Sequence, residues 1–244
     1  MQQFKRLGGD KRIGKFTEWN KSDENYCIYC GDVAETRDHV PSKTFLLEPY
    51  PDNLPTISAC ERCNNGFSSD ESYVASYINV LREKLDPKFC NEKTYKALKR
   101  DRRLKDLLDS QINIVDQKIH FSFDKGKFEN VIIKLAKGHA SFEFDHVDLD
   151  EVPTLWYDWK FNLDENEIGN FNRIPSLDIM PEAGARVSNR IVVGTNPENG
   201  ESIIFLDWVD VQQGIYRYLV YFDEDYNISV KISICELLFC IIKI

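Results

Sequence analysis

The chain has 244 residues, of which 42% are hydrophobic and 12% aromatic, and it carries a formal net charge of -9. This length and apolar content allow a sizeable buried core, and the lack of low-complexity tracts excludes a disordered chain. The negative charge argues against a protein that coats nucleic acid without discrimination.

No run of about 18 apolar residues is present to span a bilayer, and the N-terminal residues lack the apolar core of a signal peptide. We therefore expect a cytoplasmic protein with no membrane partner. Lys231, Glu236 and Lys243 interrupt the most apolar stretch, residues 228–244, whose β-branched residues favour a buried strand.

Three regions follow one another along the chain. Residues 1–25 are polar and basic with several glycines, which predicts an N-terminal arm. Residues 26–85 contain four clustered cysteines, a turn-rich segment and the start of a helical pattern, so we predict one small metal-stabilised module there. We predict an α+β domain over residues 86–244, which could bind a partner protein or nucleic acid.

Apolar residues three and four apart predict helices between residues 70 and 109, with a break at Asp86 and Pro87. Ten Lys or Arg residues stand against four Asp or Glu from Arg82 to Lys105, whereas residues 140–244 have seven against nineteen. The basic helices could therefore face the phosphates of a nucleic acid while the acidic half repels them. The alternative is a solvated helix face.

Alternating patterns dominate the rest of the chain. Residues 117–123 predict a strand, residues 126–138 a short helix that Gly138 closes, and residues 139–144 another strand. Turn segments then separate further β-like runs, which together predict a mostly antiparallel sheet. These runs are residues 154–163, 189–195, 202–211, 215–222 and 227–242.

The cysteines predict a structural metal site. Two pairs, Cys27 with Cys30 and Cys60 with Cys63, each place two sulfurs three residues apart. Four thiolates complete a tetrahedral zinc site, which leaves no position for a reactive water and therefore stabilises the fold without doing chemistry. The other three cysteines are expected to be small buried apolar residues, and they are Cys90, Cys235 and Cys240.

Acidic, histidine and asparagine residues lie between and just after the cysteine pairs, in the segments RDHVPSK, PDNLP and ERCNNGFSSDE. This arrangement resembles the HNH family of ββα-metal nucleases, in which Asp-His ends a strand, an Asn follows, and a final His or Asn opens a helix. Flanking cysteine pairs are typical of its zinc-stapled branch. The resemblance covers residues 26–71 and implies a zinc-bound ββα-metal (HNH) module ahead of the α+β remainder.

The chemistry of phosphodiester hydrolysis explains why such residues would be needed together. A neutral imidazole can take a proton from water near pH 7, so His39 is the candidate general base. The Asp38 carboxylate and the Asn64 amide oxygen could hold Mg²⁺ or Mn²⁺, which would neutralise the leaving oxygen. The resemblance implies that Asn53 fixes the orientation of His39. Asn65 is the alternative to Asn64.

Two features leave the activity open. In a regular strand Asp38 and His39 point to opposite faces, so a local twist or a loop must bring them into one cleft. The chain reads GFSS where family members often have a lysine, which removes a phosphate contact. The alternatives to a DNA endonuclease are a non-catalytic zinc-stabilised module that binds nucleic acid or protein, and an HNH nuclease that cuts RNA.

A weaker resemblance lies in the segments VIIKLAKGHASFEF and WVDVQQGIYRYLVYF, which are similar to C-terminal regions of bacterial HNH proteins often encoded beside defence genes. It implies a role in antiphage defence with a protein partner such as a defence-system ATPase. We expect His120, His139 and His146 to be structural or exposed in strand-like or loop segments. Most of the C-terminal aromatic residues are expected in the core, among them Trp156, Tyr157, Trp159, Trp208 and Tyr216.

Overall fold

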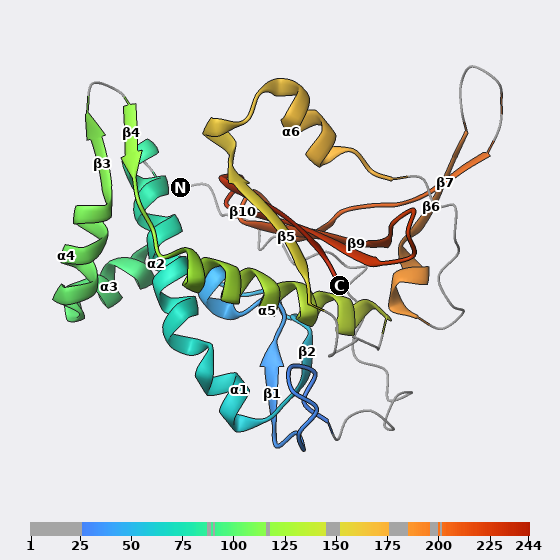
Figure 1. The fold of residues 1–244 in the computed structure, drawn as a ribbon, viewed down its shortest axis with the longest axis horizontal. Coiled ribbons are helices and arrows are strands. Elements are labelled where there is room, and N and C mark those ends of the chain that lie inside the picture. Colours follow the sequence, from blue (N-terminus) through green and yellow to red (C-terminus); the bar gives the residue numbers. More distant parts are fainter. Residues whose placement is uncertain are drawn as a thin grey trace, which may run out of the picture.

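The structure is a computed structural model that describes residues 26–86, 89, 91–115, 118–144, 152–175, 185–195, 200 and 202–244 (Figure 1). The predicted arm at residues 1–25, Cys90 and His146 lie outside the described residues. The described chain is a mixed α+β structure, as predicted. None of its helices is both long and apolar enough to cross a bilayer.

A small hairpin and two helices open the described chain. Strand β1 (Thr36–His39) pairs antiparallel with β2 (Thr56–Ala59) in an unbroken register. The loop between them contains the 3₁₀ helix η1 (Lys43–Phe45). Helix α1 (Glu61–Gly66) follows β2 directly, and helix α2 (Ser68–Leu85) comes next.

The predicted break near Asp86 is confirmed, but the basic segment after it forms two helices rather than one. These are α3 (Glu92–Arg100) and α4 (Arg102–Gln111). Asp101 divides them because its side chain accepts a hydrogen bond from the backbone of Leu104 at 3.0 Å and so caps α4. A hairpin of β3 (Ile112–Val115) and β4 (Lys118–Phe121) follows and confirms the strand predicted near residue 120.

Helix α5 (Lys125–Phe144) corrects two predictions. It continues through Gly138 instead of ending there, and residues 139–144, predicted as a strand, form its last turns. His139 therefore lies in a helix, not in a strand or loop. A Cβ at Gly138 would lie 3.0 Å from Val40 and 3.4 Å from Ile57, so the glycine allows α5 to pack closely on the β1–β2 hairpin.

The C-terminal part forms a five-stranded antiparallel sheet, which confirms the predicted pattern. Its strand order is β5-β11-β10-β9-β8. These strands are β5 (Thr154–Trp159), β8 (Val209–Gln212), β9 (Tyr216–Phe222), β10 (Ile228–Ile234) and β11 (Leu238–Lys243). The remaining elements are η2 (Lys160–Asn162), α6 (Glu165–Asn172), η3 (Arg186–Arg190) and the paired strands β6 (Ile191–Thr195) and β7 (Ser202–Leu206).

The apolar C-terminal stretch forms two strands where one was predicted. Cys235 and Glu236 adopt left-handed backbone angles, with φ of 55° and 54°, and reverse the chain between β10 and β11. This turn is difficult to predict because its two residues are not the Asn or Gly that left-handed turns favour. The turn keeps both strands in the interior of the sheet.

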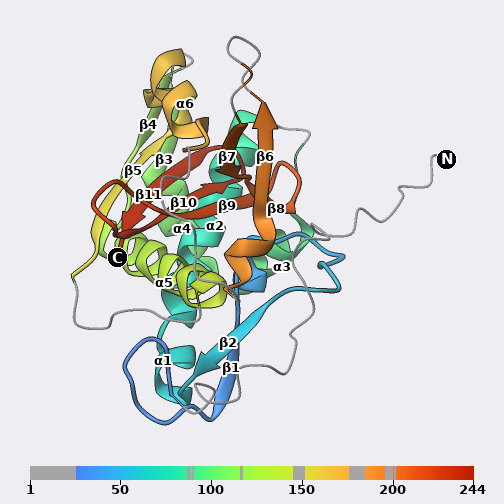
Figure 2. The same ribbon diagram turned by 90° about the vertical axis from the view of Figure 1, so that its right-hand side faces the viewer.

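Helix α5 covers one face of the sheet and α6 lies over the other (Figures 1 and 2). The main core joins the sheet to the N-terminal elements, since Val40, Tyr77 and Trp159 belong to one buried cluster. A smaller cluster on the opposite face includes Phe171 of α6 and Phe239 of β11. The predicted domain boundary at residue 86 stays a prediction. Helix α2 ends at this point, and the main core contains residues from both sides of it.

Most of the aromatic residues singled out from the sequence are indeed in the core. Trp159, Trp208 and Tyr216 are buried, whereas Trp156 is 41% exposed. Tyr157 packs against the main core while remaining half-buried.

Candidate functional site

The four paired cysteines come together at one point, which confirms their predicted clustering. Their sulfur atoms all lie within 4.8 Å of one another. A turn closed by Gly31, whose φ is 75°, brings Cys27 and Cys30 to the same side. Cys60 caps the N-terminus of α1 and Cys63 lies in its first turn, which aims both thiols at the first pair.

The chemistry of this cluster suits a metal ion such as zinc. Four sulfur donors match the tetrahedral site that zinc prefers in proteins. The backbone N–H of Cys63 donates to Cys60 Sγ at 3.4 Å and lowers the pKa of Cys60, whereas burial raises the pKa of Cys27 and of Cys63. Binding of a metal ion would displace the remaining thiol protons and tie the loop at residues 27–30 to α1.

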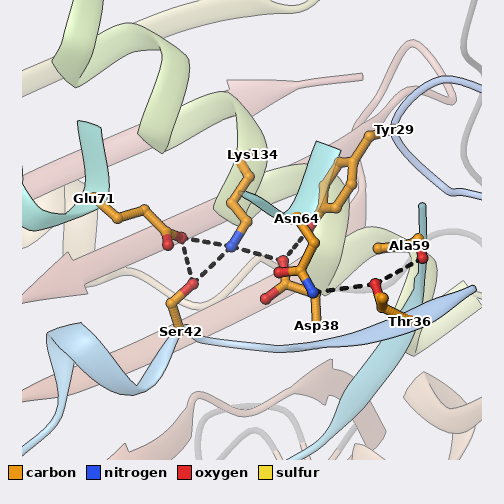
Figure 3. Close-up of polar contacts among 8 residues, drawn as sticks. All are labelled: Tyr29, Thr36, Asp38, Ser42, Ala59, Asn64, Glu71 and Lys134. Atoms are coloured by element: carbon orange, nitrogen blue, oxygen red, sulfur yellow. Dashed lines mark hydrogen bonds and ion pairs between the residues drawn. The ribbon is translucent and has the colours of Figure 1, made fainter. Parts of the chain in front are cut away.

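Asp38 points from β1 into the protein interior. Only 7% of its surface is exposed. Its Oδ2 atom lies 2.7 Å from the ammonium of Lys134 and accepts a hydrogen bond from the Tyr29 hydroxyl at 2.9 Å (Figure 3). The carboxylate is therefore held in one orientation by two side chains outside the predicted motif.

Lys134 of α5 is the centre of a buried polar network. Its ammonium contacts Glu71 at 2.5 Å and Ser42 at 2.6 Å in addition to Asp38, and Ser42 also donates a hydrogen bond to Glu71 (Figure 3). Only 2% of the Lys134 side chain is exposed. A buried ammonium between two carboxylates is well compensated in charge.

Asn64 lies over the same face of β1 as Asp38. Its amide nitrogen donates to Thr36 Oγ1 at 3.1 Å, and Thr36 donates in turn to the carbonyl of Ala59 at 2.9 Å. Thr36 and Asp38 are two residues apart in a strand, so their side chains share a face. Asn64 is half-buried and directed at β1, whereas Asn65 is exposed, which favours Asn64 as the candidate ligand.

The donor set suits a hard divalent cation. In the described part of the chain, the contacts of Asp38 fall on Oδ2 and those of Asn64 on its amide nitrogen. The second carboxylate oxygen and the amide oxygen therefore remain as donors of the type that Mg²⁺ and Mn²⁺ prefer. Tyr29 and Lys134 would orient the carboxylate, as partners of metal-binding groups commonly do. The catalytic metal itself stays a prediction.

His39 is the last residue of β1 and half-buried. Burial lowers the pKa of His39, and the positive charge of Lys43 lowers it further, so the imidazole is neutral at pH 7. Among the described residues its buried Nδ1 atom has no hydrogen-bond partner. The imidazole is thus in the protonation state that a general base needs.

The side chains of Asp38 and His39 point to opposite faces of β1. Asp38 pairs with Ile57 and His39 with Thr56 in a ladder without a bulge, so successive side chains point to opposite faces. The local twist that a shared cleft requires is not present within β1. The two side chains therefore lie on opposite faces of β1, the Asp38 carboxylate buried and His39 at the end of the strand.

Asn53 lies in the turn before β2 and is half-buried. Its predicted part in orienting His39 stays a prediction. Of the other described histidines, His120 is exposed on β4, and His139 is buried against Tyr216 and Tyr218.

Five residues of the site were not predicted from the sequence: Tyr29, Thr36, Ser42, Glu71 and Lys134. No local pattern marks these residues. Ser42 and Glu71 contact Lys134, which reaches the hairpin from a helix far along the chain.

Comparisons of the chain with protein-family models, with curated proteins and with solved structures find no match.

Proposed function

We propose that this protein is a metal-dependent endonuclease of the HNH type that hydrolyses phosphodiester bonds in DNA. The observation that carries the proposal is the position of Asp38 and Asn64 over one face of β1, with a neutral His39 at the end of the same strand. The four-cysteine cluster lies at the start of α1, which carries Asn64. These are the residue types that hydrolysis of a phosphodiester requires.

Each residue has a separate part in the proposed reaction. His39 accepts the proton of the attacking water at one of its ring nitrogens. Asp38 and Asn64 would hold the divalent ion through oxygen, and Tyr29 and Lys134 hold the Asp38 carboxylate in place. The ion, when bound, supplies positive charge for the leaving oxygen.

The proposal includes a biological setting. The similarity of the C-terminal segments to proteins encoded beside defence genes supports a role in prokaryotic antiphage defence. A protein partner such as an ATPase would then direct or trigger the cutting. The acidic charge of the C-terminal half would repel DNA, so this half is the part that we assign to a protein partner.

Nicking of a supercoiled plasmid tests the proposal. We expect the purified protein to nick DNA with Mg²⁺ or Mn²⁺, and His39→Ala to abolish nicking while the circular dichroism spectrum stays unchanged. His120→Ala is the matched control, since His120 is an exposed histidine on β4. Full activity of His39→Ala would rule out His39 as the base, and cleavage of RNA alone would move the assignment to RNA.

A second candidate function is a zinc-stabilised module that binds nucleic acid or protein without catalysis. The contact that favours it is the ion pair between Asp38 and Lys134, because an ammonium already compensates the carboxylate. This candidate predicts no Mn²⁺ site that depends on Asp38. Titration of Mn²⁺ followed by electron paramagnetic resonance, in the wild type and in Asp38→Asn, separates the two functions.

A further inference from the structure

We propose that the groove between the β1–β2 loop and helix α3 binds the phosphate backbone of duplex DNA and leads it to His39. This inference rests on the proposed function, because it supplies the path of the substrate to the candidate base. The groove has a volume of about 610 Å³. Leu47 lines one side, and Lys93, Lys96 and Arg100 of α3 line the other.

The cations of α3 are placed to follow one nucleic-acid strand. Lys93, Lys96 and Arg100 are all exposed and occur three and four residues apart, which puts them on one helix face. From Lys93 to Arg100 the helix rises about 10 Å, the length of about three nucleotides along one strand of a duplex. Three phosphates could thus each meet one side chain.

Tyr50 connects α3 to the loop that follows His39. The ammonium of Lys93 donates to the Tyr50 hydroxyl at 2.9 Å and lies 5.3 Å from the centre of its ring. Lys43, from the same loop, lies 5.7 Å from that ring. Figure 2 shows this loop beside α3. Positive charge therefore continues from Arg100 to Lys43.

Lys43 is the positively charged residue of this series that lies nearest to the candidate base in the sequence. It lies in η1, in the loop that follows His39, and is exposed. A phosphate bound at Lys43 would therefore lie near the end of β1. His39 is the last residue of that strand.

The acidic residues of the groove do not cancel its charge. Glu92 pairs with Lys96 at 3.1 Å, but both side chains are more than half exposed, so the pair is weak and can exchange for a phosphate. Glu48 accepts a hydrogen bond from Tyr50 at 3.2 Å. The three cations that line the groove exceed these two carboxylates in a protein whose net charge is -9. They could also replace the phosphate contact that the GFSS segment lacks.

The other side of α3 and α4 offers a matched control. A second hollow there, of about 500 Å³, contains Lys99, Arg102 and Lys105 around an apolar floor. These three side chains are exposed like those of the groove. None of the residues that line this hollow belongs to the loop after His39. Removing the charges of Lys99, Arg102 and Lys105 therefore changes the net charge equally without touching the proposed path.

Binding of a short duplex, followed by fluorescence anisotropy over a series of salt concentrations, tests the inference. The full chain is used in the His39→Ala background without added Mg²⁺ or Mn²⁺, so that no cleavage occurs. We expect Lys93→Ala/Lys96→Ala/Arg100→Ala to weaken binding at least about tenfold and to lower the salt slope by about 0.9 for each lost phosphate contact. Lys99→Ala/Arg102→Ala/Lys105→Ala should stay within about twofold of the parent.

Equal losses in the two triple variants, or no loss in the groove variant, would overturn the inference. Tighter binding of single-stranded DNA or RNA than of the duplex would overturn the choice of duplex DNA. The outcome is separable from that of the proposed function. If the wild type cuts DNA but the groove variants bind as tightly as the control, only the inference about the groove is wrong. If the groove variants selectively lose binding but the wild type never cuts DNA, only the nuclease proposal is wrong.

Discussion

The ammonium of Lys134 lies 2.7 Å from Oδ2 of Asp38, and both side chains are more than nine-tenths buried. The two residues come from α5 and β1, so this ion pair fixes the hairpin of the candidate site to the helix that covers the C-terminal sheet. The same ammonium contacts Glu71 of α2. Three elements therefore depend on one buried cation.

Replacement of Lys134 by methionine should destabilise the protein strongly. The change leaves the Asp38 and Glu71 carboxylates buried without a cation, which typically costs about 3–5 kcal/mol in the free energy of unfolding. Lys105→Met is the control, because the Lys105–Asp109 pair is exposed and worth no more than about 1 kcal/mol. Urea denaturation measures both, and similar losses in the two variants would contradict the structural role of Lys134.

Loss of one clustered cysteine should remove the bound metal. Cys60→Ser deletes one sulfur donor, while the serine hydroxyl can still cap α1, so we expect the zinc content to fall from about one ion per chain to none without loss of the helix. Cys235→Ser, in the turn between β10 and β11, should keep its zinc. Inductively coupled plasma mass spectrometry measures the content, and zinc retained by Cys60→Ser would show that the site is elsewhere.

A methyl group added at Gly138 should lower the free energy of unfolding, whereas one added at Gly169 should not. Alanine at position 138 would press on Val40 and Ile57, and overpacking typically costs about 1–3 kcal/mol. Gly169 lies in α6 with no atom within 4 Å of a built Cβ, so Gly169→Ala should stabilise its helix by up to about 1 kcal/mol. Thermal unfolding measures the stability of the two alanine variants. Adding Val40→Ala to Gly138→Ala should restore part of the stability that Gly138→Ala loses.

The stability of the protein should fall as the pH drops below about 6.5, the ordinary pKa of histidine. Burial lowers the pKa of His139 well below its usual value, and Arg190 lowers it further. As the pH falls, His139 therefore binds a proton in the unfolded chain but not in the folded chain. This difference lowers the free energy of unfolding by up to about 1.4 kcal/mol per pH unit for one group. Burial lowers the pKa of His39 too, so His39 contributes with the same sign.

His139→Gln isolates the contribution of His139. We expect the variant to lose stability less steeply between about pH 6.5 and pH 5 than the wild type, because one of the two perturbed histidines is gone. His120→Gln, at an exposed position, should keep the wild-type slope. Urea unfolding at a series of pH values gives the slopes, and an unchanged slope in His139→Gln would contradict the buried neutral imidazole.

Patterns with a short range in sequence were predicted correctly. The cysteine pairs each fit one tight turn, so their spacing alone indicated the cluster, and the alternation of residues 215–222 indicated β9. Gly138 was misread as a helix end because a glycine that ends a helix and one that permits close packing look the same in sequence. What distinguishes them is the nearby Val40, which directly follows β1 about a hundred residues earlier in the chain.

The sequence by itself determined that Cys27, Cys30, Cys60 and Cys63 would meet, because this relationship spans single turns and one hairpin. Only the tertiary structure decided that Lys134 would compensate Asp38 and that α3 would lie beside the loop after His39. The physical reason is that a buried charge takes its partner from whichever element packs against it, and that choice depends on the whole core rather than on any local pattern.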